Sequence, residues 1–432
     1  MGYPFKKKIL IEATKWISGD NDGIQRYGAE LVQALLPIAK NKPDEWEIDV
    51  YFGMTFTFNL VDIYEYISSG KSKSDAPVSL KILLWRMRIK KALRTFIRTI
   101  FPEPLANLVE SAKQELDRLF WSLFKPLNVD RYDLVHLILP QSYNFISRSK
   151  TSALVTTVHD LTHLYWPQFH VLGNVTQAQK GFDFCIARKS AFIAVSDSTR
   201  EDLLKTYREI APESVFRVYE ACDPQKFYRI EDSNVLRKVR ETYGIPERRY
   251  LLSLSTLEPR KNLIGTIKAF LGLVREKPEI DVILVIAGKK GWKHEHLFTD
   301  VTLKSDRLIF TGFVAEQDLA ALYSGALALS YVSYYEGFGL QALEAMSCGI
   351  PVVYGNSGAL PEVVGEGGLG ADPDNLEDIK EKFQLMVLDD ELRQSLAQKA
   401  FARAKNFSWE RTVNETLNVY QKVITASRLE SV

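Results

Sequence analysis

The sequence has few cysteines and no long hydrophobic run. Its three cysteines, Cys185, Cys222 and Cys348, are a small and odd set, which argues against a disulfide framework and fits a reducing compartment. They also lack the spacing of metal ligands. No window of ~18 consecutive apolar residues occurs, so a transmembrane helix is not expected. The N-terminal apolar run is broken at Glu12, which is too early for a signal peptide and favours a first strand. We therefore expect a cytoplasmic protein.

The sequence also lacks an excess of charge of either sign. Among its 432 residues, 55 Lys and Arg stand against 54 Asp and Glu, so the net charge is +1. This balance gives no reason to expect bulk nucleic-acid binding. At ~100–200 residues per domain, the length predicts two or three domains. The composition therefore favours a multi-domain enzyme but does not identify its ligand.

Short apolar runs alternate with helical patterns in the first half of the chain. A Gly- and Asx-rich loop at residues 19–23 separates the first run from a pattern with helical spacing at residues 24–38. Such alternation implies a parallel sheet that is covered on both faces. The strands expected here lie in the opening run at residues 6–16 and at residues 49–52, 134–137, 153–158 and 191–195.

The same alternation restarts after a polar stretch that ends in Gly244-Ile245-Pro246, where we place the domain boundary. The strands expected in this second half are residues 250–254, 282–287, 308–310, 327–331 and 351–354, with helices over about 263–274, from near Gly339 and after Phe407. We predict an N-terminal domain at 1–225 with an insert at about 60–130, a linker at 226–247, a C-terminal domain at 248–406, and a helix at 407–432 that crosses back.

One segment, residues 81–98, differs in composition from the rest of the chain. It carries seven Lys and Arg, no acid, and apolar residues that include Trp85 and Phe96. A basic amphipathic helix of this kind could lie on an anionic membrane surface. It could equally be a solvated helix whose apolar side covers the first domain. The sequence leaves both interpretations open.

Residues 333–346, which directly follow the apolar run ALALSYV, are the richest candidate site. Gly337 and Gly339 would let the backbone approach a ligand closely, and strong helix formers follow them. The unpaired N–H groups at a helix N-terminus suit a phosphate. Glu336 in the loop could lie beside a reacting sugar, and Glu344 two helical turns later could reach ribose hydroxyls. The alternative is an ordinary strand-to-helix turn with two incidental acids.

Three further sites precede this stretch. Arg260 and Lys261 lie just past the end of a strand, where open α/β sheets bind ligands, and could neutralise a diphosphate. They could also be a solvated helix start. His159 ends another strand, although a lone histidine there is more often structural. Asp22-Gly23 closes the first strand-to-helix loop, whose backbone could approach a ligand.

Together these residues resemble the donor site of the family 4 retaining glycosyltransferases. The E-x7-E pattern from Glu336 to Glu344 lies in YEGFGLQALEAMSCGIPVV and is followed by SGALPEVVG and ADPDN. Further matches in the second half are STLEPRKNL, VIAGKKGW and IFTGFV, in the same order and spacing. In the first half the resemblance is patchier and rests on GIQRY, TVHDLTHLYWP and AVSDSTREDL. FSWERT near Phe407 is similar to the segment that crosses back between domains.

The resemblance implies a GT-B fold, in which two Rossmann-like α/β domains with parallel sheets face a central cleft. Enzymes of this kind bind a nucleotide-sugar mainly in the C-terminal domain and an acceptor mainly in the N-terminal one. They usually need no divalent metal, and this sequence offers no DxD motif in a plausible donor loop. We therefore expect no cofactor and no metal site.

The resemblance also implies roles for four catalytic residues. Arg260 and Lys261 would hold the donor diphosphate and stabilise the leaving group. Glu336 would contact the donor sugar, and His159 would lie at the reaction centre and orient the sugar. The reaction would retain the anomeric configuration through a short-lived ion pair shielded on one face. No enzymatic nucleophile is required.

Other residues would bind the donor without taking part in the chemistry. Glu344 would hold the ribose, Gly23 would let the first loop touch the phosphates, and the amides of residues 338–340 would hold the sugar or phosphate. The full donor-binding set is Gly23, Gly288, Phe313, Gly337, Phe338, Gly339, Leu340 and Glu344.

Two departures from the family pattern affect the choice of donor. The first loop has Asp22-Gly23 where Gly-Gly is usual, and Gln341 follows EGFGL where proline is usual. The PRKN form at residues 259–262 is similar to members that transfer mannose in bacterial surface polysaccharides. We predict a hexosyltransferase that moves mannose from GDP-mannose to a glycan or lipid-linked glycan in polysaccharide or lipopolysaccharide biosynthesis. A UDP-sugar donor is the alternative, and peripheral membrane attachment would run through residues 81–98.

Three other functions fit these residues less well. A nucleotide-sugar epimerase of the same fold should lack PRKN together with E-x7-E in this order. A catalytically dead scaffold subunit is disfavoured by the intact Glu336, Arg260 and Lys261. A dinucleotide-dependent oxidoreductase is disfavoured because no G-x-G-x-x-G follows the first strand.

Overall fold

The computed structural model describes residues 5–17, 23–52, 57–68, 129–146, 153–170, 172–289 and 305–430. The basic segment 81–98, most of the predicted insert at about 60–130, and Asp22 lie outside the described residues. Membrane attachment through residues 81–98 therefore stays a prediction. Within the described part of the chain, no helix combines the length and apolarity that crossing a membrane requires.

The first sheet has seven strands in the order β3-β2-β1-β4-β5-β6-β7. Neighbouring strands from β2 through β1 and β4 to β5 pair in parallel, whereas β3 pairs with β2 in antiparallel fashion. Five strands fall on the predicted runs; β3 and β7 have three residues each, too few to show a periodic pattern. The strands are β1 (Lys7–Glu12), β2 (Trp46–Tyr51), β3 (Thr57–Asn59), β4 (Leu134–Leu137), β5 (Ala153–Val158), β6 (Ala191–Ala194) and β7 (Val215–Arg217).

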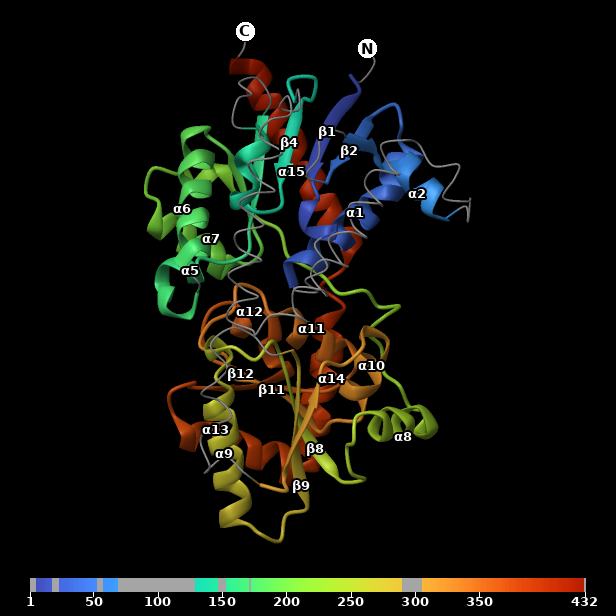
Figure 1. Cartoon of the computed structure of the whole chain (residues 1–432), viewed down its shortest axis with the longest axis vertical. Helices are drawn as coiled ribbons and strands as arrows, with labels where there is room; N and C mark the ends of the chain where they lie inside the picture. The colour runs from blue at the N-terminus through green and yellow to red at the C-terminus, as the bar shows by residue number, and fades with distance from the viewer. Residues whose placement is uncertain are drawn as a thin grey trace, which may run out of the picture. The chain divides into compact units, whose positions relative to one another are not determined.

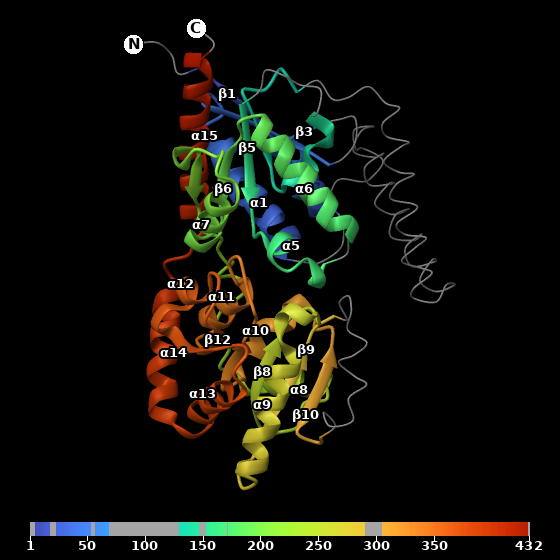
Figure 2. The same ribbon diagram turned by 90° about the vertical axis from the view of Figure 1, so that its left-hand side faces the viewer.

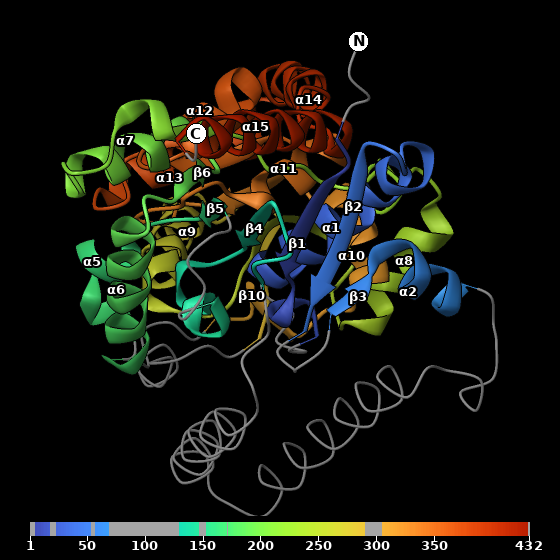
Figure 3. The same cartoon turned by 90° about the horizontal axis from the view of Figure 1, so that it is seen from above.

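Helices connect the strands of this sheet. The C-terminal helix α15 returns to lie along it (Figures 2 and 3), where the Tyr420 hydroxyl is 2.6 Å from Nδ1 of the buried His136 on β4. Arg428, near the end of α15, donates to Asp133 just before β4 at 2.8 Å. The helices are α1 (Gly23–Asn41), α2 (Leu60–Ser68), α5 (Thr162–Tyr165), α6 (Leu172–Ala187), α7 (Asp197–Thr206) and α15 (Trp409–Glu430).

The second sheet has six strands in the order β10-β9-β8-β11-β12-β13, and the pairings recorded for them are parallel. Strand β9 is apolar throughout and every one of its residues is buried, because both faces of the sheet are covered. Five strands were predicted, and β13 was not. The strands are β8 (Arg249–Leu254), β9 (Val282–Ala287), β10 (Leu308–Gly312), β11 (Ala328–Tyr331), β12 (Val352–Gly355) and β13 (Gly368–Ala371).

Successive residues of a strand enter different cores on the two faces of this sheet. Leu251 packs with helices α9 and α13, whereas Tyr250 and Leu252 pack with the helices on the opposite face. Figure 1 shows α9 and α13 on one side of the strands and α10 and α14 on the other. The helices are α8 (Ser233–Thr242), α9 (Leu263–Glu276), α10 (Glu316–Ser324), α11 (Leu340–Ser347), α12 (Leu360–Val364), α13 (Leu376–Leu388) and α14 (Asp390–Ala404).

The chain forms two compact units, and each unit is built from more than one segment of the sequence. The first contains residues 1–158, 177–193 and 413–432, and the second contains 159–176 and 194–412. Helix α8 lies inside the stretch 226–247 that is predicted as the linker. The predicted domain boundaries themselves stay a prediction.

Candidate active site

The loop that carries Glu336 joins β11 to α11 in the second unit, and two glycines determine its path. A Cβ on Gly337 would lie 1.8 Å from the carbonyl oxygen of His159, so a side chain does not fit there. Gly339 has φ of +101° and precedes α11, a backbone conformation that other residues rarely adopt. The sequence predicts close backbone approach at Gly337, and in the structure the neighbour is the backbone of His159.

A 3₁₀ helix, Pro259–Lys261, brings Arg260 and Lys261 to this loop after β8. Asn262 directly follows it with φ of +51°, a left-handed conformation that asparagine tolerates better than most residues, and α9 then begins. The backbone N–H of Tyr334 donates to the carbonyl of Arg260 at 3.0 Å, which ties the two segments together. The conformation of Asn262 and the hydrogen bond from Tyr334 thus fix the backbone on both sides of Lys261.

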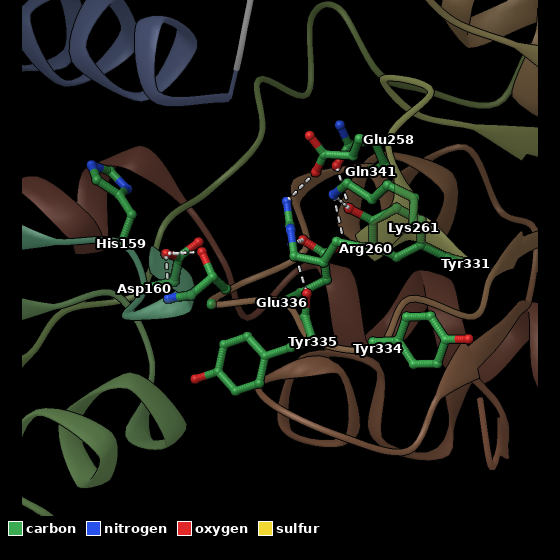
Figure 4. Close-up of polar contacts among 12 residues, drawn as sticks. His159, Asp160, Glu258, Arg260, Lys261, Tyr331, Tyr334, Tyr335, Glu336 and Gln341 are labelled. Carbon is green, nitrogen blue, oxygen red and sulfur yellow. Dashed lines mark hydrogen bonds and ion pairs between the residues drawn. The ribbon is translucent and has the colours of Figure 1, made fainter. Parts of the chain in front are cut away.

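Four charged side chains meet at this point (Figure 4). Lys261 Nζ donates to Glu336 Oε1 at 2.6 Å, and Arg260 Nη1 donates to Glu336 Oε2 at 2.9 Å. The other arm of the Arg260 guanidinium reaches Glu258 Oε1 at 2.7 Å. The sequence places the two cations and Glu336 in one site but does not single out Glu258, whose only signal is its proximity to Arg260.

Burial and charge act against each other in this cluster of Glu258, Arg260, Lys261 and Glu336. Burial raises the pKa of Glu336, but Arg260 and Lys261 outweigh it and lower that pKa to about 2. Burial and the neighbouring Arg260 lower the pKa of Lys261, against the pull of Glu336. For Arg260, burial is outweighed by Glu336 and Glu258, so its pKa is raised. The cluster thus holds two cations and two carboxylates with no net charge.

Tyr331 and Gln341 extend the cluster on the side of Lys261. Lys261 Nζ donates to the Tyr331 hydroxyl at 3.1 Å, and this hydroxyl donates to Gln341 Oε1 at 2.8 Å. Tyr331 is the last residue of β11, and Gln341 lies in the first turn of α11. The sequence shows Gln341 only as a departure from the usual proline and gives no sign of its pairing with Tyr331.

His159 adjoins the Glu336 loop through its backbone, while its ring has a different neighbour. Nδ1 of His159 lies 2.8 Å from Glu220 Oε1, a buried carboxylate that the sequence does not single out. The Thr199 hydroxyl contacts the carbonyl oxygens of both His159 and Gly337, at 3.3 and 3.2 Å. The histidine is thus brought to the predicted reaction centre by backbone packing.

The other predicted donor-binding residues are more dispersed. Glu344 is buried and accepts a hydrogen bond from the Tyr323 hydroxyl at 2.8 Å. The Phe338 ring packs against Tyr219 and Phe407, so only its backbone could face a donor.

Three predicted donor residues lie at element ends. A Cβ on Gly288, which follows β9, would lie 1.8 Å from the carbonyl oxygen of Ser255. Phe313 follows β10 and is 53% exposed, with Lys289 Nζ 5.0 Å from its ring centre. Gly23 begins α1 in the first unit. The structure does not test the donor role of these residues, which stays a prediction.

A Gly337→Ala variant should lose activity because the added methyl group collides with a backbone atom, which cannot rotate away. Overpacking of this kind typically costs ~1–3 kcal/mol or displaces the loop. We expect a lower melting temperature and a lower kcat. Gly173→Ala in α6 is the matched control, because its methyl group meets nothing within 4 Å and alanine favours helix. A Gly337→Ala enzyme that matches Gly173→Ala in both measurements would contradict the packing described here.

Comparison with known proteins identifies the family. The Glycosyl transferases group 1 family matches residues 237–403, which contain the charged cluster. O-antigen chain mannosyltransferase B of Escherichia coli is 30% identical over 417 residues, which cover 95% of this chain and 99% of that protein. The chain belongs to the group 1 glycosyltransferases. It is therefore a glycosyltransferase, as the sequence motifs predict.

Solved structures confirm the fold of this glycosyltransferase. Sucrose-phosphate synthase from Thermosynechococcus elongatus is similar with a TM-score of 0.63 and 18% identity, covering 98% of this chain and all of that one. Anabaena HepE is similar with a TM-score of 0.60 and 17% identity, covering 99% of this chain and all of that one. The predicted GT-B fold, with two α/β domains built on parallel sheets, is confirmed, with β3 as an antiparallel edge strand.

Proposed function

We propose that this glycosyltransferase transfers mannose from GDP-mannose, with retention, to a glycan or lipid-linked glycan during synthesis of a cell-surface polysaccharide in the cytoplasm. The observation that carries the proposal is the buried cluster in which Arg260 and Lys261 both contact Glu336. The full-length similarity to a protein named as an O-antigen chain mannosyltransferase supports the choice of sugar and pathway.

In this proposal, Arg260 and Lys261 meet the charge that develops on the departing diphosphate. The bond between the sugar C1 and the phosphate oxygen breaks, the acceptor oxygen bonds to C1 on the same face, and its proton passes to a departing phosphate oxygen. Because both cations are already held by carboxylates, little reorganisation is needed when that charge appears. The two cations supply positive charge at the diphosphate, so this step would not require a divalent ion.

Glu336 would hold the donor sugar while it keeps both cations in place. Its low pKa keeps it ionised, so it can accept hydrogen bonds from sugar hydroxyls. His159 would orient the sugar from the neighbouring segment, and Glu344 would hold the ribose. The backbone amides of residues 338–340, at the start of α11, would contact the sugar or phosphate.

The remaining donor contacts would come from the three predicted residues at element ends. Gly23 would bring the first loop to the phosphates, and Gly288 and Phe313 would line the nucleotide side, where β9 and β10 end. A UDP-sugar donor is the second candidate, because HepE has been solved in complex with UDP and glucose.

A thermal-shift panel of GDP-mannose, GDP, UDP-glucose, UDP and ADP-glucose tests the donor. A ligand at 100 times its Kd adds ~2.7 kcal/mol to the stability of the folded state. We expect GDP-mannose and GDP to raise the melting temperature and the UDP and ADP compounds to have little effect. Stabilisation by the UDP compounds alone would overturn the choice of GDP-mannose and favour the second candidate.

A further inference from the structure

We propose that Tyr331 and Gln341 form a positioning pair that holds the Lys261 ammonium for the donor diphosphate. The inference rests on the proposed role of Lys261 and adds two residues to it. The contacts run in a chain from Gln341 Oε1 to the Tyr331 hydroxyl at 2.8 Å, to Lys261 Nζ at 3.1 Å, and on to Glu336 Oε1 at 2.6 Å (Figure 4).

In the structure the hydrogen bonds of the three groups run in one direction, from Lys261 through Tyr331 to Gln341. An ammonium group can only donate, so the Tyr331 oxygen must accept from Lys261. The phenol has a single hydrogen, which it donates to the carbonyl oxygen of Gln341. With the glutamine amide in this orientation, the phenol oxygen is left as an acceptor for Lys261.

Gln341 has a second effect through the carboxylate of Glu336. Tyr331 is 3% exposed, and burial together with the nearby Glu336 raises its pKa, so its hydroxyl keeps its hydrogen. Without an acceptor at position 341, this hydrogen would turn toward Glu336 and compete with Lys261. By accepting it, Gln341 leaves the carboxylate of Glu336 to Lys261 and Arg260.

The charged and titratable groups around Lys261 affect whether its amine keeps its proton. Glu336, Glu258 and the Tyr331 oxygen stabilise the ammonium, whereas burial and Arg260 oppose it. The ammonium has three N–H donors, and Glu336 and Tyr331 engage two of them. Among the described residues it has no third hydrogen-bond acceptor, so one donor remains for a phosphate oxygen.

The pair also accounts for a departure in the sequence. Gln341 stands where the resemblance of the EGFGL motif leads us to expect proline, which has no side-chain acceptor. Proline is well tolerated in the first turn of a helix, so helix formation in α11 does not by itself require glutamine. A buried tyrosine at the end of β11 needs an acceptor for its hydrogen, and Gln341 provides one.

The test measures the pH dependence of kcat/KM for the donor in Tyr331→Phe, Gln341→Leu and Gln341→Glu. Both Tyr331→Phe and Gln341→Leu reduce the stabilisation of the Lys261 ammonium, so the pKa of Lys261 should fall. The alkaline limb of the profile should then move to lower pH, and kcat/KM should fall. Removal of a hydrogen bond to a charged group implies a loss of about 10- to 100-fold for Tyr331→Phe. Gln341→Glu adds a negative charge near Lys261, so the alkaline limb should move to higher pH.

Tyr250→Phe is the matched control. Tyr250 is also a buried tyrosine of this sheet, and its hydroxyl donates to the carbonyl of Leu322 at 2.6 Å, with no contact to the cluster. This variant should lose stability without a shift of the alkaline limb. Equal profiles for Tyr331→Phe and Tyr250→Phe, or a shift of the same sign in Gln341→Leu and Gln341→Glu, would overturn the positioning role.

The outcome for the wild type separates this inference from the proposed function. If the wild type uses a UDP-sugar, the choice of GDP-mannose fails, and the variants are measured with that donor. If no nucleotide-sugar is consumed, the proposed function and the positioning role both fail. If the wild type is active and the three variants behave like Tyr250→Phe, only the positioning role fails.

Discussion

Replacing Lys261 with methionine should lower kcat about 10²- to 10³-fold, the usual effect of removing one preorganised donor from developing negative charge. Methionine keeps nearly the length of the side chain and removes its charge and its N–H donors. Lys261 Nζ lies 2.6 Å from Glu336 Oε1, so the cation is fixed in place even without a donor substrate. Steady-state kinetics with GDP-mannose, together with binding of GDP by calorimetry, would measure the effect.

Lys380→Met is the matched control for this variant. Lys380 is likewise a lysine held by ion pairs: it contacts the carboxylates of Glu276 and Glu377 at 2.6 and 2.5 Å, and it bridges α13 and α9 away from the cluster. Its replacement should leave kcat unchanged, because Lys380 lies outside the charged cluster and its two carboxylate partners are exposed to solvent, where ion pairs contribute little to stability. Wild-type turnover by Lys261→Met would remove Lys261 from the mechanism.

Replacing Glu336 with glutamine should reduce both activity and stability. The substitution keeps the shape of the side chain but leaves Arg260 with Glu258 as its ion-pair partner and removes the ion pair of Lys261, although both cations are largely buried. Breaking a buried ion pair by removing one partner typically costs ~3–5 kcal/mol. We expect kcat to fall at least as far as in Lys261→Met, because the sugar contact and the positions of both cations are lost together.

The pH dependence of unfolding separates the charge of Glu336 from its shape. Its pKa is about 2 in the folded protein and 4.5 for an ordinary glutamate, so its ionisation stabilises the folded state above about pH 4.5. That contribution, ~3 kcal/mol by linkage, is lost as the pH falls toward 2. Denaturant unfolding should therefore show a wild type that exceeds Glu336→Gln in stability near pH 7, with the difference shrinking under acid. A constant difference across this range would contradict the electrostatic account.

Most of the regular structure could be predicted from the sequence because it depends on local patterns. The strands at 134–137, 153–158 and 282–287 have the predicted bounds, since each is a short apolar run that is buried on both faces. The start of α11 just after Gly339 follows from a glycine next to strong helix formers. Strands β3 and β7 could not be predicted, because three residues held mainly by their neighbours show no period of their own.

The candidate site could be predicted only in part, because its contacts join residues far apart in the chain. The residue types and spacing of Glu336, Arg260 and Lys261 indicate a diphosphate site. No local pattern shows that Glu220 faces His159. The sequence also does not show why residue 337 has to be glycine, because the atom that excludes a side chain there belongs to His159.

By itself, the sequence determined the family, the two-sheet architecture and the residue types that carry the chemistry, because these depend on motifs and on local burial patterns. The tertiary structure decided which charged side chains form ion pairs with one another. Arg260 and Lys261 could each have been a solvated side chain, but folding buries them against Glu336 and Glu258. Removal from water is unfavourable for each charge alone, and the fold offsets this cost by bringing side chains of opposite charge together. The same packing gave Gln341 its partner in Tyr331.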